Sequence, residues 1–126
     1  MIPQPTEKEL DILQVLWAKG PQTVREVNDQ LRSEKEIGYT TTLKILQIMH
    51  DKGLVSRELK GKTHIYKSII SESATQQKML DKVVDKVFKG SAMNLVMQAL
   101  GNSKSTDKEL DEIRAYIDQL KNDKND

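Results

Sequence analysis

Residues 38–53 read GYTTTLKILQIMHDKG, and their pattern predicts the central helix of the fold. Within it, Thr42, Ile45, Leu46 and Met49 recur at the i, i+3, i+4, i+7 spacing of a helix that packs one face on a core. Gly53 follows at the position where helices commonly end. The stretch therefore predicts a helix from about residue 39 to residue 52. Its outward positions are Thr40, Thr41, Leu43, Lys44, Gln47 and Ile48.

Two capping boxes upstream predict two more helices. Thr6 precedes Glu9 by three residues and Thr23 precedes Glu26 by three, so each hydroxyl and carboxylate can bond the other residue's backbone N–H. A glycine and a proline at positions 20 and 21 separate the two helices. The expected core of the three helices is Leu10, Leu13, Trp17, Val27, Leu31, Ile45, Leu46 and Met49.

A basic hairpin is expected after the third helix. Leu54–Glu58 and His64–Ser68 have the composition of short strands, and residues 59–63 form a turn built around Gly61. Three helices followed by a hairpin is the order of a winged helix-turn-helix domain. The predicted fold class is therefore mostly α with a small β-hairpin wing, and the winged domain is expected to span residues 1–70.

Residues 71–126 read as nearly all helix. Residues 89–91, Lys-Gly-Ser, predict a break, and residues 101–105, Gly-Asn-Ser-Lys-Ser, predict a linker. Thr106 and Glu109 make a third capping box, so another helix should follow. Residues 121–126 are polar and are expected to fray.

These C-terminal helices carry more apolar side chains than a lone helix can bury. They could fold back over the winged domain, or they could pair with a second chain. A two-fold dimer would hide a patch that is otherwise prone to aggregate, and it would place two winged domains on a palindrome. Residues 71–126 are therefore predicted to be a helical dimerisation domain. The residues expected in the dimer are Met79, Leu80, Val83, Val84, Val87, Phe88, Leu95, Val96, Leu100, Leu110, Ile113, Ile117 and Leu120.

The composition of the chain excludes several kinds of functional site. The chain has 126 residues, a formal net charge of +1 and no cysteine, which excludes disulfides, thiolate metal sites and cysteine nucleophiles. His50 and His64 lie on different predicted elements without metal-ligand spacing, so no metal is expected. No phosphate-binding glycine loop, nucleophile motif or paired-carboxylate site is present, so neither an enzyme nor a cofactor is expected. No apolar run could span a bilayer and no signal peptide is visible, which predicts a cytoplasmic protein.

The near-neutral total hides a segregation of charge. Residues 37–70 hold 6 basic and 2 acidic side chains, a net charge of +4, whereas the segments before and after carry −2 and −1. A basic zone of this kind fits a phosphate footprint, although charge alone is equally consistent with a solvated surface.

The third helix and the hairpin carry the chemistry of DNA recognition. Thr40, Thr41, Lys44 and Gln47 can bond base edges or phosphates from a helix in the major groove. Lys60, Lys62 and His64 would give the wing a basic tip. The same residues could be an ordinary exposed helix face and a solubilising turn, but the two features together favour DNA binding.

In three stretches of sequence the chain resembles the penicillinase repressors of the BlaI/MecI type. The resemblance is carried by residues 6–17 (TEKELDILQVLW), 38–43 (GYTTTL) and 52–55 (KGLV), and it extends over nearly the whole chain. It implies a dimeric winged-helix repressor that occludes promoters by binding palindromic operator DNA, often of β-lactam-resistance genes. It also implies relief by proteolysis, under a membrane sensor–protease. The groove-facing residues would be Gly38, Tyr39, Thr40, Thr41, Leu43, Lys44 and Gln47.

Two positions depart from the family pattern. Ile48 stands where members often have an arginine near the end of the recognition helix. The candidate cleavage bond is Gln98–Ala99, where characterised members have Asn-Phe. Copper-responsive relatives use cysteine ligands, which this chain lacks. Two alternative functions stay open, a small-molecule-responsive winged-helix regulator and a protein–protein adaptor on a winged-helix fold.

Overall fold

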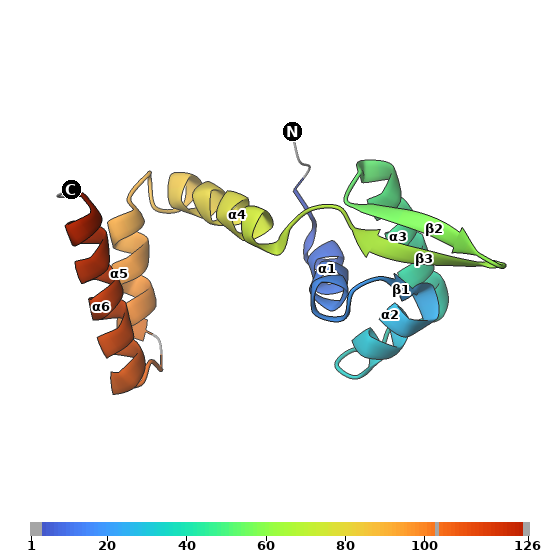
Figure 1. The fold of residues 1–126 in the computed structure, drawn as a ribbon, viewed down its shortest axis with the longest axis horizontal. Coiled ribbons are helices and arrows are strands. Elements are labelled where there is room, and N and C mark those ends of the chain that lie inside the picture. Colours follow the sequence, from blue (N-terminus) through green and yellow to red (C-terminus); the bar gives the residue numbers. More distant parts are fainter. Residues whose placement is uncertain (1–3, 103, 125–126) are drawn as a thin grey trace. The chain divides into compact units, whose positions relative to one another are not determined.

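A computed structural model describes residues 4–102 and 104–124 of the chain (Figure 1). The chain divides into two compact units, Met1–Asp81 and Lys82–Asp126. The first unit contains α1 (Glu7–Lys19), β1 (Gln22–Thr23), α2 (Val24–Arg32), α3 (Tyr39–Lys52), β2 (Val55–Lys60) and β3 (Thr63–Ser68). Helix α4 (Glu72–Lys86) begins in the first unit and ends in the second, which also holds α5 (Ala92–Asn102) and α6 (Asp107–Lys124).

The helix boundaries in the first unit follow the predicted capping signals. The Thr6 N–H donates to Glu9 Oε1 at 2.9 Å and the Glu9 N–H donates to Thr6 Oγ1 at 3.2 Å. Thr23 and Glu26 repeat this arrangement at 2.9 and 3.2 Å. Gly53 ends α3 in the left-handed conformation with φ 81°, which glycine adopts without strain. The predicted limits of the third helix are confirmed.

The hairpin belongs to a three-stranded antiparallel sheet of order β1-β3-β2. The pairing reaches Lys60 opposite Thr63, so the turn consists of two residues and the predicted five-residue turn is wrong. Gly61 occupies the first turn position with φ 65°, which is where a type II′ turn needs glycine. The two-residue strand β1 was not predicted, because only its pairing of Gln22 with Tyr66 and Thr23 with Ile65 makes it a strand.

The core of the first unit lies between the helices and the sheet (Figure 1). Four of the eight predicted core residues are buried, whereas Leu10, Trp17, Leu31 and Ile45 are half-buried. Trp17 stays at the core's edge because its indole N–H donates to the Ile70 carbonyl at 3.0 Å. The buried apolar residues are Ile12, Leu13, Leu16, Val24, Val27, Leu46, Met49, Leu54, Val55, Tyr66 and Ile70.

Two sets of polar contacts, one buried and one partly buried, fix the two ends of α3. At its start, the Asn28 amide of α2 donates to Thr42 Oγ1 at 2.8 Å and to the Ile37 carbonyl at 3.1 Å. At its end, Lys52 Nζ donates to the carboxylate of the buried Glu9 in α1 at 2.9 and 3.0 Å. The exposed face of α3 is therefore held at a set angle and rotation relative to α1 and α2.

Replacing Asn28 with alanine is expected to destabilise the first unit (Met1–Asp81, called the winged unit from here on) by about 1–3 kcal/mol, because Thr42 and the Ile37 carbonyl would lose a buried partner. Urea unfolding followed by Trp17 fluorescence measures the effect. Asp29→Ala, at the exposed neighbouring position, is the matched control and should change stability by less than about 0.5 kcal/mol. Equal stability of the two variants would contradict the anchoring role of Asn28.

The second unit is helical, with little burial of its own. Lys89 and Gly90, both with positive φ, form the predicted break between α4 and α5. The third capping box is present, with the Glu109 N–H donating to Thr106 Oγ1 at 3.1 Å. The linker prediction is wrong at Gly101 and Asn102, which are helical, and its Ser103 lies outside the described residues. Helix α6 continues through Lys124, so the fraying prediction is wrong for residues 121–124, while 125 and 126 lie outside.

No helix in the described parts of the chain is long and apolar enough to cross a membrane.

Candidate DNA-binding site

The outward side of α3 presents a row of polar side chains. Thr40, Thr41, Lys44 and Gln47 are all exposed, as the helical spacing predicted, whereas Leu43, also expected to face outward, is half-buried and packs against the core. Gly38 is the N-cap and offers no side-chain cap, so the first N–H groups of the helix are open to an external acceptor. A helix N-terminus of this kind favours binding of a phosphate oxygen. The exposed polar side chains that follow it along α3 can form hydrogen bonds with base edges.

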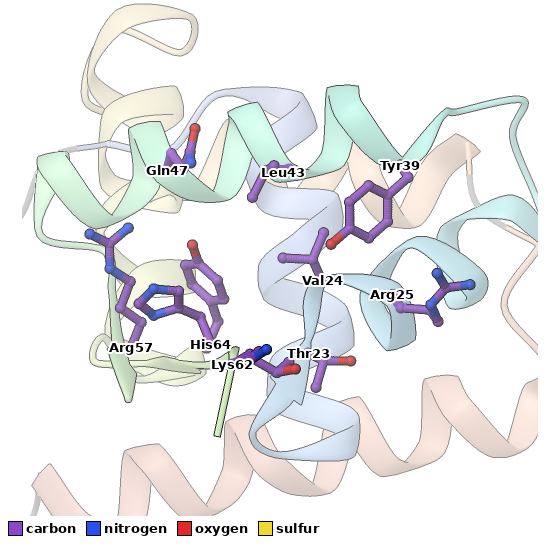
Figure 2. Close-up of a pocket in the computed structure, with 11 residues that line it drawn as sticks. Thr23, Val24, Arg25, Tyr39, Leu43, Gln47, Arg57, Lys62 and His64 are labelled. Atoms are coloured by element: carbon purple, nitrogen blue, oxygen red, sulfur yellow. The ribbon is translucent and has the colours of Figure 1, made fainter. Parts of the chain in front are cut away.

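An open groove of about 630 Å³ runs between α3, the first turn of α2 and the hairpin (Figure 2). Tyr39, Leu43 and Gln47 border it from α3, spaced one helical turn apart. The figure shows Arg57, His64 and Lys62 of the hairpin across from them, with Val24 and Arg25 of α2 nearby. Its full lining is Thr23, Val24, Arg25, Tyr39, Leu43, Gln47, Arg57, Lys62, Thr63, His64 and Tyr66.

The groove is cationic and aromatic. Arg25 comes from α2, Arg57 from β2 and Lys62 from the turn of the hairpin, and no carboxylate is among the described residues that line the groove. None of the ion pairs found in residues 4–102 and 104–124 involves these three cations. The Arg25 guanidinium lies 5.9 Å from the centre of the Tyr39 ring, within cation–π range. Within the described residues, the groove therefore offers three cationic side chains that take part in no ion pair with a carboxylate.

Lys35, shortly before α3, differs from the three cations of the groove because it forms an ion pair within the protein. Its ammonium donates to Asp11 Oδ2 at 2.6 Å, and this hydrogen bond raises the pKa of Lys35 above its usual value. Because its charge is already paired, Lys35 has less to offer an incoming phosphate than the unpaired cations of the groove.

The structure brings together some of the sequence-predicted DNA-binding residues and separates others. Tyr39, Leu43, Gln47, Lys62 and His64 share the groove. Thr40, Thr41 and Lys44 lie on the adjoining outer side of α3, next to Gly38 at its start. Lys60 lines a different hollow, with Ser56 and Glu58, because alternate residues of β2 point to opposite faces of the sheet.

Both arginines of the groove, Arg25 and Arg57, were not predicted as site residues, and neither were its lining residues Thr23, Val24, Thr63 and Tyr66. Arg57 had a sequence signal, since it lies two residues after the buried Val55 and therefore shares its face of the strand. Arg25 had none, because its neighbourhood depends on how α2 meets α3. The aromatic pair of His64 and Tyr66, with ring centres 6.3 Å apart, follows instead from the local alternation of side chains along β3.

The residues predicted for dimerisation and cleavage all lie in the C-terminal helices and the turn after α4. No described residue of α5 or α6 is buried, and Val87, Val96 and Ile117 are exposed, as is Leu120. Gln98 and Ala99 are exposed residues inside α5. In the described residues, no group of three or more His, Cys, Asp or Glu side chains could hold a metal ion.

The fold and this face define a winged helix-turn-helix transcription regulator. The profile of the family described as "Penicillinase repressor" matches residues 5–119, and the chain belongs to that family. Membership of a repressor family places the chain among transcriptional regulators and not among enzymes.

Individual relatives agree with this assignment. The penicillinase repressor of Staphylococcus aureus is 21% identical over 112 residues, which is 89% of each chain. The methicillin resistance regulatory protein MecI of S. aureus strain N315 is 21% identical over 88% of this chain and 90% of its own. Among solved structures, monomeric BlaI of Bacillus licheniformis, determined in complex with the blaP half-operator, is 26% identical with a TM-score of 0.51. That likeness covers 58% of this chain and 89% of the BlaI chain.

Proposed function

We propose that this chain represses transcription by binding palindromic operator DNA as a homodimer and occluding the promoter. The main support is the cationic groove, whose described lining residues include no carboxylate, beside the exposed polar face of α3. The operator complex of the related BlaI chain supports duplex DNA as the partner.

In this proposal α3 enters the major groove, where Thr40, Thr41 and Lys44 meet base edges. The three cationic side chains of the groove then lie along the sugar–phosphate backbone that borders the major groove. Arg25 and Arg57 flank the backbone and Lys62 approaches it from the turn, where Gly61 leaves room for close contact. Phosphate contacts of this kind position the protein, and contacts to bases supply the selectivity.

The dimer is proposed from the apolar surface of the second unit. Met93, Val96 and Met97 of α5 are 71%, 42% and 65% exposed, and Ile117 and Leu120 of α6 are 46% and 43% exposed. Burying one such side chain contributes about 1.5–3 kcal/mol. A second copy of the same unit is the partner that covers an identical face and also supplies the second reader of a palindrome.

Replacing Arg25 or Arg57 with alanine is expected to weaken binding to all duplexes to a similar degree. Each loss should reduce the slope of log K against log salt by about 1 per protomer, because a phosphate contact releases about one counterion. Fluorescence anisotropy over a salt series measures both quantities. Lys62→Ala should lower the slope more than Lys60→Ala, because only Lys62 lines the groove.

Lys108→Ala removes an exposed cation from the second unit and is the matched control. An unchanged salt slope in Arg25→Ala and Arg57→Ala would show that the DNA backbone does not follow this groove. A loss confined to one DNA sequence would instead assign the two arginines to base recognition.

We also propose that repression is relieved by proteolytic cleavage in α5. The Gln98–Ala99 bond lies in a helix whose described residues are not buried in one protomer, so local opening of α5 would expose it. A cut there would separate part of the apolar surface without touching any groove residue. A membrane sensor–protease pathway would be the source of the cut.

The alternative functions predict different responses to salt. An adaptor that binds a protein through apolar contacts should be insensitive to salt, whereas DNA binding should weaken steeply. A small-molecule regulator would need an enclosed apolar pocket, and the groove is instead open and cationic.

A further inference from the structure

Ile48 is an isoleucine on the outward side of α3, with 42% of its surface exposed. Its neighbours Leu46 and Met49 are fully buried, so Ile48 points away from the core. A helix turns by about 100° per residue, which places Ile48 on the same side as Lys44, four residues earlier, and Thr41, seven residues earlier. It is thus an aliphatic side chain within an otherwise polar, DNA-facing row.

Packing within the winged unit does not account for this side chain. Ile48 belongs neither to the core nor to the half-buried residues that pack on the core. It does not line the groove of Figure 2. Isoleucine also has a lower helix propensity than leucine or lysine, so a preference for helix does not explain it at an exposed position.

The chemistry of the major groove suggests a partner for Ile48. A branched aliphatic side chain can neither donate nor accept a hydrogen bond, so it gains nothing from phosphates or from the polar edges of bases. The apolar group that base pairs present in the major groove is the C5-methyl of thymine. We propose that Ile48 contacts a thymine methyl group and makes this repressor select thymine over cytosine at one position of each half-site.

This inference rests on the proposed function. The geometry of α3 then predicts where in the half-site the thymine should lie. Seven residues of helix span about 10 Å, which corresponds to about three base steps. The thymine read by Ile48 should therefore lie about three base pairs from the pair contacted by Thr41.

The test uses the whole chain and a palindromic duplex selected by that chain from a random library. Each thymine is replaced in turn, in both half-sites, by deoxyuridine, which lacks the methyl group, and binding is measured at constant salt. Wild-type protein should lose roughly fourfold in affinity per half-site at one thymine position, the effect of one buried methyl group. A 5-methylcytosine·guanine pair at that position should bind more tightly than a cytosine·guanine pair, because it restores the methyl group.

Variants at position 48 separate this contact from general loss of fold. Ile48→Ala should bind the thymine and deoxyuridine duplexes equally, whereas Ile48→Val should keep most of the difference. Gln47→Ala, at the adjacent outward position, should bind more weakly overall and retain the wild-type deoxyuridine profile. If Ile48→Ala keeps that profile, or if wild-type protein is insensitive at every thymine, the assignment is wrong. A wild-type chain that selects no duplex would overturn the proposed function itself.

Discussion

Removing the second unit is expected to lower affinity for a palindromic operator by about a hundredfold or more. A dimer binds its second half-site as an intramolecular event, and the resulting gain in avidity is on the order of 10²–10⁴. A fragment of residues 1–81 keeps the complete buried core and all groove residues. It should therefore fold, sediment as a monomer and retain weak binding to DNA of any sequence. Sedimentation and gel-shift titration of the fragment and the whole chain check both parts.

A single substitution in the whole chain should also abolish the dimer, without removing any part of the chain. Ile117→Asp places a charge on the apolar side of α6 and should convert the dimer to monomer. Ala115→Asp introduces the same side chain on the opposite side of α6 and is the matched control, which should stay dimeric. Should the whole chain sediment as a monomer at micromolar concentration, or the 1–81 fragment still dimerise, the C-terminal helices do not join two protomers.

The second large effect is expected from the recognition helix. Thr41→Ala combined with Lys44→Ala should remove contacts that contribute about 1–3 kcal/mol each, in both half-sites of the operator. Operator affinity should fall by about a hundredfold or more, while affinity for an unrelated duplex falls much less. Lys121→Ala removes a cation from α6 and serves as the control. Retention of full selectivity by the double variant would exclude this face of α3 as the reader.

Local signals predicted the helices of the winged unit well. The capping boxes of Thr6 with Glu9 and of Thr23 with Glu26 are fully formed, and α3 ends at its glycine. These features depend on residues within one turn of each other, so the sequence contains all of their physical causes. The side of α3 that faces outward follows from the same local periodicity.

Features made by several elements were not predicted. Strand β1 exists because Gln22 meets Tyr66 in β3, and the sequence around Gln22 contains no strand pattern. Arg25 and Arg57 become neighbours of one groove through the packing of α2, α3 and the hairpin. The burial of Glu9, which pairs with Lys52, similarly depends on where α1 crosses α3. In each case the cause is tertiary contact between distant residues.

Equilibrium binding of the whole chain decides whether it is a dimeric operator-binding repressor. Affinity is measured for the selected palindromic duplex and for a scrambled duplex over a salt series, and sedimentation gives the mass of the complex. We expect two chains per duplex, affinity for the selected duplex about 10³-fold or more above the scrambled one, and steep weakening with salt for both. Equal affinity for the two duplexes, or binding that does not respond to salt, would contradict this expectation.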